Sequence, residues 1–138
     1  MKKLLTISLS VLLLDQLTKY FFKNKLISIT SFFRIGYVEN TGAAFGILKG
    51  FKILFILVAL AVIFFIFKYY DDIKKEKPGL RLAIGLLLGG VAGNLIDRVF
   101  LGFVRDFLDF SFWPTFNVAD ACSTVGVVIL TYHILFKK

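Results

Sequence analysis

Four long apolar segments stand out in the pattern of hydrophobic and polar positions along the chain. They cover about 4–22, 51–70, 80–99 and 117–136, and each approaches the roughly 20 apolar residues that a helix needs to cross the hydrocarbon core of a bilayer. Together they use most of the 138 residues. The pattern therefore predicts a single integral membrane domain over 1–138, an all-α bundle of four transmembrane helices without a separate soluble domain.

The composition agrees with a membrane protein. Hydrophobic residues make up 58% of the chain, and the mean hydropathy of +0.82 implies more apolar surface than a soluble domain of this length can bury. Lys2 and Lys3 before the first apolar segment resemble the start of a cleaved signal peptide. No small-x-small cleavage site follows, however, and polar residues come next (Asp15–Lys19). We therefore expect an uncleaved first span.

The formal net charge is +8, but the lysines gather at the ends of the apolar segments rather than in a basic-aromatic array. This distribution favours contact with phospholipid head groups over nucleic-acid binding. Nine lysines and arginines fall on one predicted side of the membrane and eight on the other, so the positive-inside rule barely decides the orientation. The early Lys2–Lys3 pair favours both termini in the cytoplasm. The single cysteine, Cys122, excludes an intrachain disulfide and a thiolate metal cluster.

The connection between the first two apolar segments, about 23–50, has the character of a small sheet. Ile27–Thr30 alternates apolar and polar residues, Phe33–Val38 is rich in strand formers, and Asn40–Gly42 gives a turn signal before the compact apolar stretch Ala43–Leu48. Bare strand edges cannot lie in hydrocarbon. We therefore predict a curled β-rich cradle on the membrane surface.

The third apolar segment carries glycine at every fourth position, a pattern that lets another helix approach closely. Asp97 continues this stripe, and an adjacent stripe carries Asn94 and Arg98; the glycines are Gly85, Gly89 and Gly93, with Gly90 on the adjacent stripe. Residues three and four apart share a helix face, so Asn94, Asp97 and Arg98 meet at one end. Two interpretations stay open: hydrogen bonds to loop carbonyls with Asp97 neutralising Arg98, or contact with a substrate.

Asp15 and Lys19 are spaced i, i+4 late in the first segment. Ionisable residues within a membrane are costly and rare. One interpretation is an ion pair at the helix end, with Lys19 extending toward the membrane surface. The other is that Asp15 holds the first span to polar groups of the surface loop. Neither makes Asp15 a catalyst.

Asp106 and Asp120 flank a short hydrophobic loop, so both are expected at the same membrane face. Two carboxylates that share a site can divide one proton, and one can then activate water while the other protonates a leaving group. Asp120 has a simpler interpretation as well, because Asn117 is a good N-cap and an acid three residues later suits a helix N-terminus. For Asp109 we favour an exposed loop charge. The sequence offers no Ser-Lys, Cys-His, metal-ligand or phosphate-loop arrangement.

Two other classes of function remain. A small transporter or channel subunit would use Asp15, Asp106 and Asp120 as a proton relay. The polar residues cluster toward one face, however, and the chain lacks a transporter-type repeat. Only the glycine stripe supports a structural assembly protein.

Five blocks in order give the chain a family resemblance: Asp15–Lys19, Glu39–Phe45, Gly93–Arg98, Gly102–Phe107 and Phe116–Asp120. With four apolar segments and this length, they resemble lipoprotein signal peptidase (signal peptidase II), a bacterial intramembrane aspartyl peptidase. The nearest departure is Ala121-Cys122 after the second aspartate, where a small polar residue is expected first.

The resemblance implies that Asp106 and Asp120 are the catalytic dyad. It also implies a set of residues that line the site and bind substrate: Asn40, Gly42, Asn94, Arg98 and Asn117. Asp15, Lys19 and Asp97 are then structural polar residues. The implied substrate is a diacylglyceryl-modified prolipoprotein, cut just before its lipidated cysteine without a metal or other cofactor. The expected location is the bacterial inner membrane, with the site at the extracytoplasmic face and the protein a monomer.

Overall fold

The computed structural model describes residues 2–42 and 48–136. Its helices and strands follow one another in the order α1 (Lys2–Phe21), β1 (Leu26–Ser28), β2 (Phe33–Asn40), α2 (Lys52–Lys68), α3 (Tyr70–Ile73), α4 (Pro78–Phe100), β3 (Val104–Phe110), β4 (Trp113–Phe116) and α5 (Val118–Phe136). The four long helices coincide with the four predicted apolar segments to within a few residues. Three of them, α1, α4 and α5, are long and apolar enough to cross a membrane. The fourth, α2, has 17 residues.

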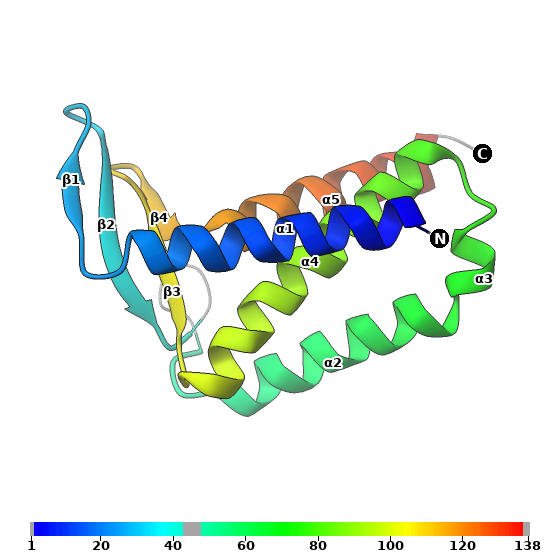
Figure 1. Ribbon diagram of the computed structural model, residues 1–138, viewed down its shortest axis with the longest axis horizontal. Coiled ribbons are helices and arrows are strands. Elements are labelled where there is room, and N and C mark those ends of the chain that lie inside the picture. Colours follow the sequence, from blue (N-terminus) through cyan, green and yellow to red (C-terminus); the bar gives the residue numbers. More distant parts are fainter. Residues whose placement is uncertain (1, 43–47, 137–138) are drawn as a thin grey trace.

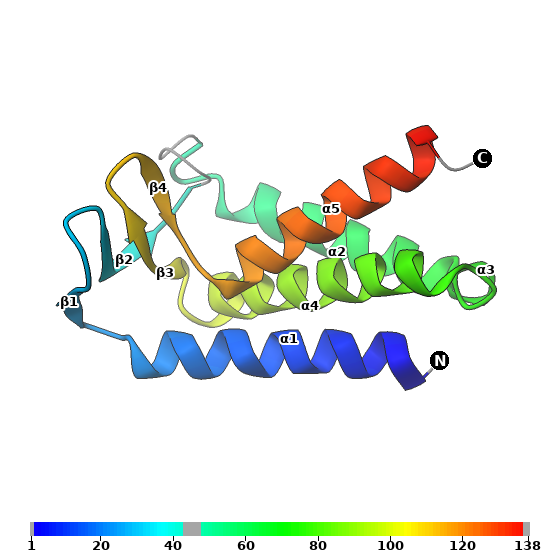
Figure 2. The same cartoon turned by 90° about the horizontal axis from the view of Figure 1, so that it is seen from above.

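Helix α4 is the centre of the bundle, with α1, α2 and α5 packed around it. The first turn of α1 and the last turn of α5 lie at one end, and the sheet lies at the opposite end (Figure 1). Figure 2 shows α1 and α2 on different sides of α4. An apolar cluster of Leu4, Ile66, Ile84 and Leu88 fills the bundle between these helices, away from the sheet.

The predicted close approach at the glycine stripe is confirmed. A Cβ atom on Gly89 would lie 2.5 Å from the carbonyl oxygen of Ser8 in α1, and one on Gly90 would collide with the Ala119 carbonyl and the Ser123 hydroxyl in α5. The two glycine stripes therefore face different partners. The stripe that contains Gly89 lets α1 approach, and the stripe that contains Gly90 lets the start of α5 approach. Both helices therefore pack against the polar end of α4.

The sheet is antiparallel, with strand order β1-β2-β3-β4. The strands predicted within 23–50 are present as β1 and β2, but the sheet is not confined to that segment as predicted. Half of its strands come from the segment between α4 and α5, which was predicted to be a short hydrophobic loop. A two-stranded hairpin is marginal on its own, and its open edge is satisfied when β2 pairs with β3. The predicted compact stretch after Gly42 lies outside the described residues, except for Leu48.

Two features bring β3 back against the helices. Gly102 follows α4 with a φ of +88°, a conformation that other residues rarely adopt, so the chain turns sharply into the strand. Phe107 of β3 is then buried against Phe22 at the end of α1, with ring centroids 5.1 Å apart. Asp106, beside Phe107 in the chain, consequently points to the other face of β3, toward the first turn of α5.

Candidate active site

Asn117 and Asp120 form a reciprocal cap at the start of α5. The backbone N–H of Asp120 donates to the Asn117 side-chain oxygen (2.9 Å), and the backbone N–H of Asn117 donates to a carboxylate oxygen of Asp120 (3.3 Å). The predicted N-cap is therefore confirmed. The same Asn117 amide also donates to Asp106 (2.7 Å). One fully buried side chain thus fixes the two carboxylates relative to each other.

Asp106 is almost completely buried, with 1% of its surface exposed. Its two oxygens accept hydrogen bonds from the side-chain amides of Asn40 (2.9 Å) and Asn117 (2.7 Å). Burial, and after it the nearby charge of Asp120, raise the pKa of Asp106 to about 7 against the lowering effect of the two amides. Near neutral pH, this carboxyl group can therefore hold or release a proton at little cost.

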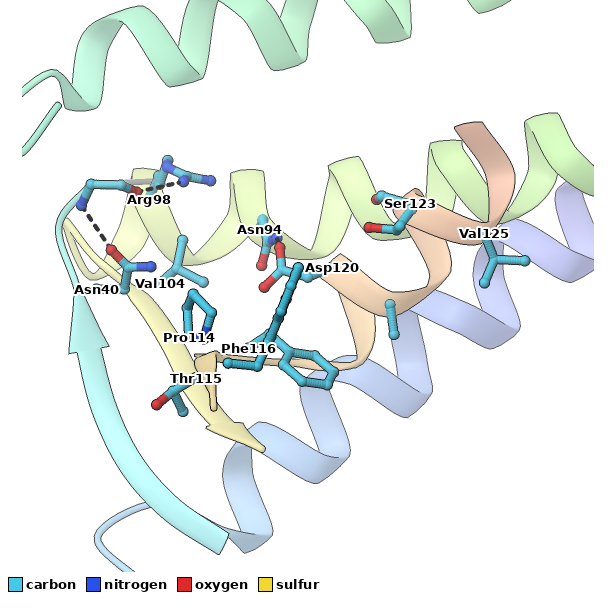
Figure 3. A pocket seen from close by; sticks show the side chains of 14 residues that line it. Asn40, Asn94, Arg98, Val104, Pro114, Thr115, Phe116, Asp120, Ser123 and Val125 are labelled. Carbon is cyan, nitrogen blue, oxygen red and sulfur yellow. Dashed lines mark hydrogen bonds between the residues drawn. The ribbon is translucent and has the colours of Figure 1, made fainter. Parts of the chain in front are cut away.

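Asp120 opens onto a cavity of about 590 Å³ at the sheet end of the bundle. Its carboxylate accepts a hydrogen bond from the Asn94 amide (2.7 Å). Figure 3 shows Asn94 beside Asp120, with Asn40 and Arg98 on one side of them and Ser123 and Val125 on the other. The cavity is lined by Asn40, Gly42, Asn94, Arg98, Val104, Trp113, Pro114, Thr115, Phe116, Asp120, Ala121, Ser123, Thr124 and Val125.

Four of the five predicted substrate-binding residues line this cavity: Asn40, Gly42, Asn94 and Arg98. Asn117 does not, because it is wholly buried behind the two carboxylates. Arg98 donates to the Gly42 carbonyl (3.3 Å) and lies 4.7 Å from the ring centroid of Phe55 in α2. The interpretation that Arg98 bonds a loop carbonyl is confirmed. Asn94 instead bonds side chains.

The prediction that Lys19 extends toward the membrane surface is wrong. Neither Lys19 nor Asp15 has any exposed surface. The Lys19 ammonium lies 2.8 Å from Asp15, 2.9 Å from the Asn94 side-chain oxygen and 3.3 Å from Asp97. The reason is the smooth face of α4 at Gly93, where a Cβ atom would lie 2.5 Å from an Asp15 oxygen. Close packing of α1 on α4 leaves Lys19 no path outward.

Of the two interpretations of Asp15, the ion pair with Lys19 is confirmed, and the contact with the surface loop is not. Asp15 accepts a hydrogen bond from the backbone N–H of Ala119 (2.9 Å) in the first turn of α5, and so does not hold the surface loop. Asp97 does not neutralise Arg98. It pairs instead with Arg105 (2.7 Å) and Lys19. Within the described part of the chain, Asp15, Lys19 and Asp97 form one buried cluster that joins α1, α4 and α5.

Sequence reasoning missed Gln16 and Arg105 as members of this cluster. The Gln16 amide donates to Asp15 and Asp97, and the Arg105 guanidinium donates to the Gln16 oxygen (2.7 Å). Gln16 adjoins Asp15 in the first sequence block, which was a usable signal. Arg105 likewise lies in the fourth block, beside Asp106, but the sequence did not indicate its partners because they lie on other elements of the fold.

Asp109 is neither in a loop nor freely exposed, contrary to the prediction. It lies on β3 and pairs with Arg34 of β2, and its side chain is 14% exposed. This pair lines a separate groove rather than the cavity at Asp120. Among the residues that the structure describes, no three His, Cys, Asp or Glu side chains gather closely enough to hold a metal ion.

The fold and the site together are those of a membrane enzyme. Two solved structures described as bacterial membrane enzymes match the whole chain, with TM-scores of 0.88 and 0.87 at 30% and 29% sequence identity, over 93% and 96% of their own lengths. The family model for signal peptidase (SPase) II matches residues 7–136. The lipoprotein signal peptidases of Moorella thermoacetica and Caldanaerobacter subterraneus are 43% and 45% identical, over 95% and 92% of this chain and 91% and 92% of theirs. The chain therefore belongs to the signal peptidase II family, whose members are peptidases.

Proposed function

We propose that the protein removes signal peptides from diacylglyceryl-modified prolipoproteins by hydrolysing the peptide bond before the lipidated cysteine, with Asp106 and Asp120 as the catalytic pair. The supporting observation is the Asn117 amide, which bonds Asp106 while its own oxygen caps the helix turn that presents Asp120. Two carboxylates fixed in this way, one buried and one open to a cavity, suit acid-base catalysis on a single water molecule.

The pair holds one proton in the competent state. One carboxylate removes a proton from water, and the resulting hydroxide attacks the carbonyl carbon of the scissile peptide. The other carboxyl group then gives its proton to the departing amide nitrogen as the C–N bond breaks. After bond cleavage the pair again holds one proton, now on the carboxylate that took it from water, and transfer of this proton to the other member restores the starting arrangement. Because the two groups interact strongly, they titrate as a unit.

The cavity has the polarity that a lipidated peptide requires. Its polar end carries Asn40 and Arg98 near the sheet, and its apolar walls come from Trp113 and Phe116 of β4 and Val125 of α5. We assign the glyceryl ester and scissile peptide to the polar end, where Asn94 and Gly42 also lie. The signal peptide and acyl chains then follow the apolar walls. Asn117 positions the dyad without touching substrate.

The same proposal includes four spans, with α2 as the additional one. Its 17 residues correspond to about 26 Å of helix, close to the thickness of the hydrocarbon core. Ile53, Leu57 and Phe64 along it are more than half exposed, which suits contact with lipid. We place the sheet and the site at the extracytoplasmic face of a bacterial inner membrane, with both termini in the cytoplasm and the protein a monomer among phospholipids.

A proton-relay transporter or channel subunit is not favoured. A relay requires polar groups distributed through the depth of the membrane. Here four carboxylates all belong to the sheet end of the bundle. Asp15 bonds the first turn of α5, Asp97 bonds β3, Asp106 lies on β3, and Asp120 lies in the first turn of α5.

The test uses purified protein and a diacylglyceryl-modified prolipoprotein. Asp106→Asn and Asp120→Asn should each abolish cleavage while thermal unfolding stays cooperative. Asp109→Asn is the matched control, because this third carboxylate of the segment pairs with Arg34 outside the cavity. It should retain nearly full turnover. Full activity in either dyad variant, or an equally deep loss in Asp109→Asn, would refute the assignment.

A further inference from the structure

We propose that Arg105 is a positioning residue for the aspartate pair, acting through Asp97 and Lys19 on the Asn94 amide that bonds Asp120. This inference rests on the proposed function. Arg105 precedes Asp106 on β3 and points to the opposite face of the strand, toward α1 and α4. It therefore touches neither substrate nor the reacting atoms.

Arg105 holds Asp97 with a fork of hydrogen bonds. Its Nη2 donates to one carboxylate oxygen (2.7 Å), while its Nε and its backbone N–H donate to the other (3.2 and 3.0 Å). The same Nη2 reaches the Gln16 side-chain oxygen (2.7 Å). A planar guanidinium can form this two-oxygen contact, and a lysine ammonium cannot. Arg105 thus fastens the strand that carries Asp106 to both α1 and α4.

The effect reaches the dyad through Lys19. Its ammonium has three N–H donors and meets three acceptors, on Asp15, Asn94 and Asp97. The Asn94 side-chain oxygen accepts hydrogen bonds from Lys19 and from the Asn117 amide (3.1 Å). These bonds orient the Asn94 amide so that its nitrogen donates to Asp120. Because Arg105 donates three of the hydrogen bonds that Asp97 accepts, the Lys19 ammonium keeps its hydrogen bond to Asn94. Without Arg105, Asp97 draws Lys19 toward itself and the hold on Asn94 weakens.

The charge balance of the cluster also indicates that loss of Arg105 disturbs the aspartate pair. Lys19 and Arg105 neutralise Asp15 and Asp97, so the buried cluster carries no net charge while the dyad nearby holds one proton. The charged or titratable groups that face Arg105 are Asp97 from α4, Asp15 from α1 and Tyr37 from β2, together with Glu39, the residue of β2 that is paired with Arg105 across the strands. Removal of the guanidinium leaves one buried negative charge uncompensated beside the dyad. The weaker hydrogen bond from Asn94 and this uncompensated negative charge both make ionisation of the dyad harder.

The first test is Arg105→Gln in the full-length protein. We expect kcat to fall by about 10- to 100-fold, the scale of a small misplacement of catalytic groups, with KM nearly unchanged because Arg105 does not line the cavity. The pH profile of kcat should move to higher pH by at least about half a unit. Arg34→Gln is the matched control, since it breaks the other arginine-aspartate pair of β3 and should leave both rate and profile unchanged.

Two further variants separate positioning from simple loss of structure. Arg105→Lys keeps the charge without the fork, so its profile should return to the wild-type position while kcat stays below wild type. Arg105→Gln combined with Asp97→Asn restores neutrality, and its profile should also return while kcat stays low.

A pH profile of Arg105→Gln that superimposes on the wild-type profile would overturn the inference. If this variant does not fold, a displaced profile in Arg105→Lys or in the double variant would overturn it equally. Failure of the proposed function is recognised separately, by turnover in Asp106→Asn. An inactive Asp106→Asn together with an unshifted Arg105→Gln rejects only the role of Arg105.

Discussion

Replacement of Lys19 by methionine removes a buried charge while keeping a side chain of similar length. The structure gives Lys19 three short contacts, to Asp15, Asn94 and Asp97, and no exposed surface. Hydrogen bonds to charged groups contribute about 1.5–3 kcal/mol each, so three would suggest a loss of about 5–9 kcal/mol. The carboxylates, however, do not become wholly unpaired.

Asp97 keeps its fork from Arg105, and Asp15 keeps the N–H of Ala119 and the amide of Gln16. These remaining partners reduce the expected loss. We therefore expect Lys19→Met to lower the free energy of unfolding by about 3–5 kcal/mol, the cost of breaking a buried pair by removal of one member. Addition of Asp15→Asn should recover part of this loss, because the double variant no longer buries the uncompensated Asp15 charge.

The measurement is unfolding of the purified protein in detergent, followed with a thiol-reactive dye. Cys122 is the single cysteine and is partly buried, so its labelling reports opening of the bundle. Lys74→Met is the matched control, because Lys74 pairs with Asp71 at side-chain exposures of 47% and 80%. We expect no measurable change there. If Lys19→Met is no more destabilising than Lys74→Met, the buried cluster does not stabilise the fold and our reasoning is refuted.

Three further predictions concern the site and its support. With a pKa near 7 in the fold against an ordinary value of 3.8, Asp106 binds its proton more tightly in the native state, so it costs stability as pH rises from about 4 to 7. The free energy of unfolding of Asp106→Asn should therefore be measured at about pH 4 and, above this range, at about pH 8. Relative to wild type it should be higher at the upper pH by a few kcal/mol, and a difference that stays constant with pH contradicts the assigned pKa. Asn117→Ser keeps a helix cap but loses the amide that bonds Asp106. The cleavage rate should therefore fall at least about tenfold with little change in the unfolding midpoint. A fall in the unfolding midpoint that parallels the fall in cleavage rate would indicate that Asn117 acts only as a cap. Gly90→Val should destabilise the protein by about 1–3 kcal/mol in the dye assay, because its side chain would meet Ala119; an unchanged midpoint would show that α5 can shift.

The helices were predictable because a bilayer imposes their length and apolar character, and the chain has few residues to spare. Each predicted segment ends within a few residues of its helix. The second half of the sheet was not predictable by the same reasoning. Val104–Phe110 carries Arg105, Asp106 and Asp109 among apolar residues, a pattern typical of a loop. It forms a strand because both of its faces make contacts: Asp106 bonds Asn117 on one face, and Arg105 bonds the buried cluster on the other.

The errors at Lys19, Asp97 and Arg105 have a common physical cause. Sequence spacing places residues on a helix face, but the glycines of α4 determine how deeply that face is buried, and depth decides which charges must pair. Lys19, near a helix end, would reach water if α1 stood one side chain further from Gly93. At the observed distance it must find acceptors inside the protein, and Asp97 then needs a second cation, which β3 supplies as Arg105. The two proposed catalytic residues, Asp106 and Asp120, were identifiable because the sequence blocks that resemble the family contain them. Arg105 lies in one of the same blocks, but its pairing with Asp97 was not identifiable, because the two residues meet only after α1, α4 and β3 have packed together.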